Sequence, residues 1–170
     1  MALIQMDLMA TSLQQFVNIA ALIPAEQSSG PYPVLYLLSD IDGGPLDFIM
    51  QTPIAPLAME RGIAVIMVAP ASHNGYRNIP EKAENMETFV ADELVQVCRR
   101  SFSVCKDSKY TFIAGLGAGG EAAVRLQKMY PEVFGKAKWL EAITPETANE
   151  TMRELLDFLL PTEGGTVWPS

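Results

Sequence analysis

YTFIAGLGAGGEAA, residues 110–123, is the stretch that decides the fold of this chain. Its first five residues are almost wholly apolar, which is typical of a strand buried on both faces of a parallel sheet. Glycines follow at positions 115, 117, 119 and 120, and residues 121–129 then show the apolar spacing of a helix. The stretch therefore predicts a strand, a tight glycine turn and a helix, with Gly117 at the tip of the turn.

The rest of the chain alternates between strand patterns and helix patterns. Continuous apolar runs predict strands at 34–38 and 63–69, and residues 136–143 are expected to add one more strand. Helical spacing predicts helices at 54–60, 84–102 and 144–160. Residues 2–9 and 14–23 predict an N-terminal β-hairpin. We therefore expect an α/β fold with a mostly parallel sheet, helices on both faces and the hairpin as an antiparallel edge. A single domain over residues 1–161 and a flexible tail over 162–170 are expected.

Composition and charge exclude several classes of function. The net charge of −8 argues against binding to nucleic acid or to an acidic membrane surface. No apolar run reaches the length of about 18 residues that spans a bilayer, and the first ten residues lack the basic region of a signal peptide. Cys98 and Cys105 are expected to be a reduced pair, and His73 is the only histidine, so we expect a cytoplasmic protein with neither metal nor cofactor.

Three loops follow the carboxyl ends of the predicted parallel strands. They cover residues 39–45, 70–78 and 115–120, and ligands of such sheets bind beyond these strand ends. The sequence therefore predicts one crevice that all three loops face.

The runs PVLYLL (33–38), IAGLGAGGEAAVRLQKMYPEVFGKA (113–137) and LLDFLLP (155–161) resemble the α/β-hydrolase family, specifically its esterase D and tributyrin-esterase branch. The closest match is IAGLGAGG, which is similar to the IAGLSMGG of that branch. The resemblance covers most of the chain. It implies a serine-esterase fold in which residues 115–119 form the turn called the nucleophile elbow, G-x-S-x-G.

The departures from the family pattern all fall on catalytic positions. Gly117 stands where the family has its nucleophilic serine, and Ser39 and Asp40 stand where it has His-Gly at the start of the oxyanion loop. The resemblance also implies that the C-terminal strands are missing, with the segments that carry the catalytic acid and base, since no histidine follows His73. We therefore expect the serine-esterase activity to be absent and the elbow Gly115, Gly117 and Gly119 to be vestigial.

Two alternatives keep chemistry or a ligand in the crevice. A relocated hydrolase site would pair Ser39 with His73 and with Asp40 or Asp42. A nucleotide-binding site would use the GLGAGG glycines 115, 117 and 120, which fit G-x-G-x-x-G, with Glu141 about 20 residues further on.

Partners follow from the implied shortening of the sheet. The strand near residues 138–140 would become an open edge, which invites pairing with another chain unless the final helix covers it. We therefore expect a homo-oligomer or a complex with a related esterase chain, and a small acyl or ester ligand in the crevice.

Overall fold

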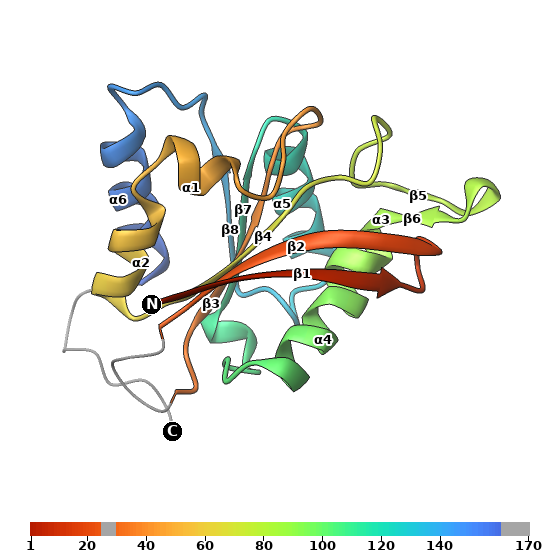
Figure 1. Cartoon of the computed structure of the whole chain (residues 1–170), viewed down its shortest axis with the longest axis horizontal. Coiled ribbons are helices and arrows are strands. Elements are labelled where there is room, and N and C mark those ends of the chain that lie inside the picture. The colour runs from red at the N-terminus through yellow and green to blue at the C-terminus, as the bar shows by residue number, and fades with distance from the viewer. Residues whose placement is uncertain (25–29, 161–170) are drawn as a thin grey trace.

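A six-stranded sheet forms the centre of the computed structural model, which describes residues 1–24 and 30–160 (Figure 1). Its strands are β1 (Ala2–Ala10), β2 (Gln15–Ile23), β3 (Val34–Leu38), β4 (Ala64–Val68), β7 (Thr111–Leu116) and β8 (Lys136–Leu140). They lie in the order β1-β2-β4-β3-β7-β8; β3, β4, β7 and β8 pair in parallel, and the β1–β2 hairpin joins β4 antiparallel. The predicted α/β fold with an antiparallel N-terminal hairpin is confirmed. The predicted tail over 162–170 lies outside the described residues.

Helices cover both faces of the sheet, and the central strands β3 and β4 are therefore buried at every position. One face carries α3 (Met86–Thr88), the π-helix η2 (Phe89–Glu93), α4 (Leu94–Ser101) and α5 (Ala118–Met129). The other face carries α1 (Asp47–Gln51), α2 (Ile54–Arg61) and α6 (Ala148–Leu159) (Figure 1). Along β3 the side chains alternate between the two clusters, so Tyr36 packs with the first group and Leu37 with the second.

Several predicted boundaries move in the structure. The helix predicted over 84–102 begins at Met86, because Glu84 and Asn85 form the short strand β6 (Glu84–Asn85), which pairs with β5 (Asn78–Ile79). Short 3₁₀ turns, η1 (Pro80–Lys82) and η3 (Ser108–Tyr110), precede β6 and β7. Helix α1 was not predicted, since five residues are too few to show a helical period. The last strand ends at Leu140 and the last helix begins at Ala148, so residues 141–147 connect them.

Within the described ranges, none of the helices has both the length and the apolar character needed to cross a bilayer. The far edge of the sheet is β8, which pairs with β7 through a five-residue parallel register. Helix α6 packs along one face of this strand, where the Lys136 ammonium donates to the Phe158 carbonyl oxygen at 3.0 Å.

Glu93 holds the turn of the N-terminal hairpin. Its two carboxylate oxygens accept from the backbone N–H groups of Thr11, at 2.7 Å, and Ser12, at 2.9 Å. Burial alone would raise the pKa of Glu93, but these N–H donors stabilise the ionised form and the net effect lowers the pKa. The acidic residue thus links the π-helix to the hairpin instead of lying on a solvated helix face.

Glu93→Gln is expected to lower the free energy of unfolding by about 1 kcal/mol at pH 7. A carboxylate whose folded pKa is lowered stabilises the fold above its unfolded pKa, so the difference from the wild type should close as the pH falls below about 4.5. Urea unfolding from pH 7 to pH 3 measures this, with the exposed Glu60→Gln as the matched control. A difference that does not change with pH would contradict the role given to the charge.

Candidate functional site

The turn between β7 and α5 has the backbone of a nucleophile elbow with glycine at its tip. Gly117 has φ +54° and ψ −120°, and its carbonyl oxygen accepts from Glu121 N–H at 3.0 Å to close the first turn of α5. A residue with a side chain adopts such a φ only at a cost of about 1–3 kcal/mol. The strand–turn–helix arrangement predicted from residues 110–129 is therefore present, and glycine removes the strain at its tip.

The carboxylate of Asp40 lies over Gly117 at the tip of this turn. Its Oδ1 accepts from the N–H of Ile41 at 2.8 Å and from the N–H of Ala118 at 3.0 Å. A Cβ built on Gly117 would overlap this same carboxylate. Asp40 therefore fills the space above the tip of the turn and is in direct contact with the elbow.

The two donors to Asp40 are the groups that form an oxyanion hole in this fold. One is the N–H of the residue after the nucleophile position, here Ala118, and the other comes from the loop after β3, here Ile41. In a working hydrolase such donors point at the oxygen that becomes negative in the transition state. Here they bind the Asp40 carboxylate at the N-terminal end of α5, where the helix dipole favours negative charge. Both backbone donors are present, and the solvent-exposed carboxylate of Asp40 accepts from them.

Ser39, the weak candidate nucleophile, lies inside the protein. Its side chain is 2% exposed, and its hydroxyl donates to the Val68 carbonyl oxygen at 3.4 Å. The Tyr76 hydroxyl donates to the Ser39 carbonyl oxygen at 2.7 Å, and burial raises the pKa of Tyr76 well above its usual value, so it keeps its proton. These contacts fix the end of β3 and direct the Ser39 hydroxyl toward β4.

His73 lies on the surface of the neighbouring loop. Its Nδ1 is 3.3 Å from Asp42 Oδ1, and the two side chains are 86% and 82% exposed. The structure thus pairs His73 with Asp42 and Ser39 with Val68, and it does not bring Ser39 and His73 together as the relocated site requires. An exposed pair of this kind is screened by water and lacks the fixed geometry of a catalytic base.

The glycines around the tip have a packing role. A Cβ on Gly119 would overlap the Leu38 carbonyl oxygen, and a Cβ on Gly115 would overlap the Gly119 backbone. These glycines let α5 pack directly against the ends of β3 and β7. The same contacts account for the GLGAGG pattern, and the Asp40 carboxylate stands at the helix end where a pyrophosphate would bind.

Charged side chains tie the loop over residues 70–85 and α3 to α5. Arg125 lies 3.2 Å from Glu121 and 3.3 Å from Glu87, and Arg77 lies 3.0 Å from Glu121. The side chains of Arg125 and Glu87 are only 17% and 13% exposed, so this ion pair is largely shielded from solvent. This network fixes the loop that carries His73 against the helix that follows Gly117.

Ile41 and Ala118 are the site residues that sequence reasoning missed. Both act through backbone N–H groups, which every residue but proline carries, so side-chain identity gives no signal for them. The available signal is a combination, with glycine at the tip of the elbow and an aspartate at the start of the loop after β3. The side chain of a short acid can occupy the space that glycine leaves at the tip.

A family model described as "Putative esterase" matches residues 10–149. The chain is also 28% identical over 144 residues to an acetyl esterase of Caldicellulosiruptor saccharolyticus, which corresponds to 79% of this chain and 53% of that protein. The chain therefore spans about half the length of the curated relative that it matches.

Two solved structures from Staphylococcus aureus share the fold. The fluorophosphonate-binding serine hydrolase F matches with a TM-score of 0.73 at 20% identity, covering 96% of this chain and 69% of that one. An S-formylglutathione hydrolase matches with a TM-score of 0.70 at 18% identity, covering 96% and 73%. At these identities the two structures establish the α/β-hydrolase arrangement of the sheet and helices, which agrees with the family resemblance of the sequence.

Proposed function

This chain belongs to the esterase family, whose model matches most of its length, and from this membership we propose that it is a member without serine-esterase activity that serves as a binding or interaction module. The observation that carries the proposal is the contact of the Asp40 carboxylate with Ile41 N–H and Ala118 N–H, above a glycine at the nucleophile position.

The family's route to ester hydrolysis needs a nucleophile, a base and free oxyanion donors. Gly117 has no side chain, so no acyl-enzyme forms at the tip of the elbow. The donors already hold the Asp40 carboxylate, and a tetrahedral oxyanion would have to displace it. The only histidine of the chain is paired with Asp42 at the surface. Each requirement is therefore unmet at the position where the family meets it.

The relocated hydrolase site and the nucleotide-binding site are less well supported by the contacts. A hydrolase built on Ser39 would need a hydroxyl that turns away from Val68 and reaches a base, although this side chain is 2% exposed. A nucleotide would bring its phosphates against the negative charge of Asp40. A small acyl or ester ligand would compete with the Asp40 carboxylate for the same N–H groups. We therefore favour an interaction role at a surface away from this turn.

We expect the purified protein to hydrolyse p-nitrophenyl acetate and butyrate no faster than the chemical background, and a fluorophosphonate probe to label none of its serines. An S-formylglutathione hydrolase serves as the active control in both assays. Turnover that Asp40→Ala or His73→Ala abolishes, or a covalent adduct on Ser39, would overturn the proposal. Turnover that survives both substitutions would be assigned by mass spectrometry of the labelled residue, and a label on this chain counts against the proposal.

A further inference from the structure

The loop between β4 and β5 carries the only Asn-Gly pair of the chain, Asn74–Gly75. Figure 1 shows this loop standing out from the sheet between the two strands, and Asn74 is exposed to solvent. Asparagine is a thermolabile residue, because its side-chain amide carbon can be attacked by the backbone nitrogen of the next residue. Glycine at that next position presents no Cβ to hinder the approach. The pair therefore has the chemistry of a deamidation site.

The turn around this pair is loosely held. The N–H of Gly75 donates to the Ser72 carbonyl oxygen at 3.2 Å, which is at the long end of the range for such bonds. The N–H of Asn74 donates to the Ser72 hydroxyl oxygen at 3.1 Å, and neither Asn74 nor Gly75 belongs to a helix or a strand. Apart from its chain neighbours, a Cβ built on Gly75 would meet only Ile41 Cδ1, at 4.0 Å. The backbone can therefore shift here at little cost in packing.

One side-chain contact restrains the amide of Asn74. Its Nδ2 donates to Glu84 Oε2 at 2.9 Å, and Glu84 belongs to the short strand β6. This bond fixes the amide on β6, so the amide is free to turn onto the Gly75 nitrogen only when the bond opens. The contact to Glu84 is therefore expected to set the rate of any reaction between the two residues.

We propose that Asn74 is a site of deamidation, that its bond to Glu84 slows the reaction, and that the product carboxylate releases the loop from Glu84. The Gly75 nitrogen forms a bond to Asn74 Cγ and gives up its proton, while the Cγ–Nδ2 bond breaks and the departing amide nitrogen takes up a proton to leave as ammonia. Water is the co-reactant of the second step and opens the resulting cyclic imide. Opening at one carbonyl gives aspartate, and opening at the other gives isoaspartate.

The new carboxylate would stand where the amide of Asn74 now donates. Two carboxylates at the present distance of 2.9 Å repel one another, so the bond that ties the loop to β6 becomes a repulsive contact. The same loop carries Tyr76, whose hydroxyl donates to the Ser39 carbonyl oxygen at 2.7 Å. Deamidation would therefore loosen a segment that packs against the end of β3, next to the elbow. This inference does not rest on the interaction role proposed above.

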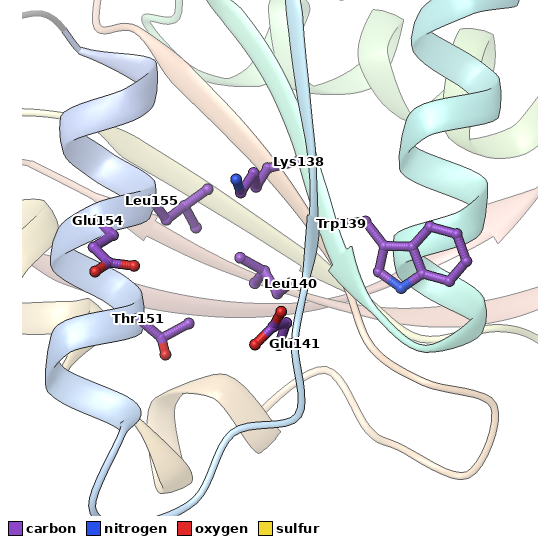
Figure 2. Close-up of a pocket in the computed structure, with 7 residues that line it drawn as sticks. All are labelled: Lys138, Trp139, Leu140, Glu141, Thr151, Glu154 and Leu155. Atoms are coloured by element: carbon purple, nitrogen blue, oxygen red, sulfur yellow. The ribbon is translucent and has the colours of Figure 1, made fainter.

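Peptide mapping by mass spectrometry tests the reaction on the full chain, incubated at physiological temperature and mildly alkaline pH. We expect the peptide that contains Asn74 to gain the mass of one deamidation and to separate into aspartate and isoaspartate forms. Direct hydrolysis of the amide would give aspartate alone. Asn149 is the internal control, because it is also exposed but precedes Glu150 in the first turn of α6, the helix that Figure 2 shows beside β8. Its peptide should stay unchanged over the same time.

Two variants separate the roles of Gly75 and Glu84. Gly75→Ser adds a side chain beside the attacking nitrogen and should slow the mass gain at least about tenfold. Glu84→Ala removes the acceptor that restrains the Asn74 amide and should speed the mass gain about fivefold. Circular dichroism shows whether each variant is folded.

The variant Asn74→Asp carries the product charge from the start. Amide hydrogen exchange over residues 74–78 should be faster in this variant than in the wild type. Asn74→Asp/Glu84→Gln should restore the slow exchange, because the glutamine amide can donate to the new carboxylate.

Four results would overturn the proposal. They are a mass gain at Asn74 no larger than at Asn149, aspartate without isoaspartate, a rate that Glu84→Ala leaves unchanged, and loop exchange that Asn74→Asp leaves unchanged. None of these readouts depends on ester turnover, so they fail independently of the assays for the non-catalytic assignment.

Discussion

Gly117→Ser should leave the protein without esterase activity and lower its free energy of unfolding by about 2–4 kcal/mol. The new side chain would take a backbone φ of +54°, and its Cβ would overlap the Asp40 carboxylate. Serine at the tip therefore has to displace Asp40 from Ile41 N–H and Ala118 N–H. Urea unfolding and p-nitrophenyl acetate hydrolysis measure the two expected effects.

Two further variants separate the causes of this loss. Gly75→Ser places a side chain at φ +73° where the nearest atom, Ile41 Cδ1, is 4.0 Å away, so it reports the backbone cost alone, about 1 kcal/mol. In the Asp40→Gly background, Gly117→Ser should lose less stability than in the wild type, because the overlap is gone. The double variant should still lack activity, since no histidine is placed as a base. Measurable esterase turnover by Gly117→Ser alone would contradict the inference that Asp40 blocks the oxyanion donors.

Gly119→Ala is expected to destabilise the protein by about 3 kcal/mol, although alanine favours a helix over glycine by about 1 kcal/mol. Its Cβ would overlap the Leu38 carbonyl oxygen and lie 2.7 Å from the Ser39 carbonyl oxygen. Both are backbone atoms at the end of β3, so they can retreat only if α5 moves away from the sheet. Denaturant unfolding measures the loss.

Gly44→Ala is the matched control for this prediction. Its added Cβ would meet only Asp47 Oδ1, at an ordinary contact distance of 3.5 Å. We expect a change within about 0.5 kcal/mol. A Gly119→Ala variant as stable as Gly44→Ala would mean that α5 does not pack on β3 as closely as described, and the packing explanation of the glycine pattern would then fail.

The sequence predicted the architecture because the architecture depends on local patterns of apolar residues and glycines. Apolar runs at 34–38 and 112–114 favoured buried strands, and the glycines after residue 114 favoured a tight turn before a helix. The π-helix over Phe89–Glu93 could not be predicted from the sequence, since a π turn and an α turn share nearly the same apolar spacing. The helix α1 was missed because one turn and a half carries no period.

The site was only half predictable. The resemblance to the esterase branch placed Gly117 at the position of that branch's nucleophile, because the residue type at each position can be read directly from the sequence. The burial of Ser39 and the surface pairing of His73 with Asp42 were not visible, since both depend on how two loops pack against β4 and α5. The fold therefore separates Ser39 from His73, which the sequence analysis had paired by residue type.

By itself, the sequence determined the alternation of buried strands and helices, because burial patterns are properties of short stretches. Its resemblance to the α/β-hydrolase family placed Gly117 at the tip of the elbow. Only the tertiary structure decided what fills that tip. Asp40 and Ala118 are 78 residues apart in the chain, and their hydrogen bond exists because parallel pairing sets the ends of β3 and β7 side by side. Contacts between distant residues follow from packing, so the carboxylate in the oxyanion position appears only in the folded molecule.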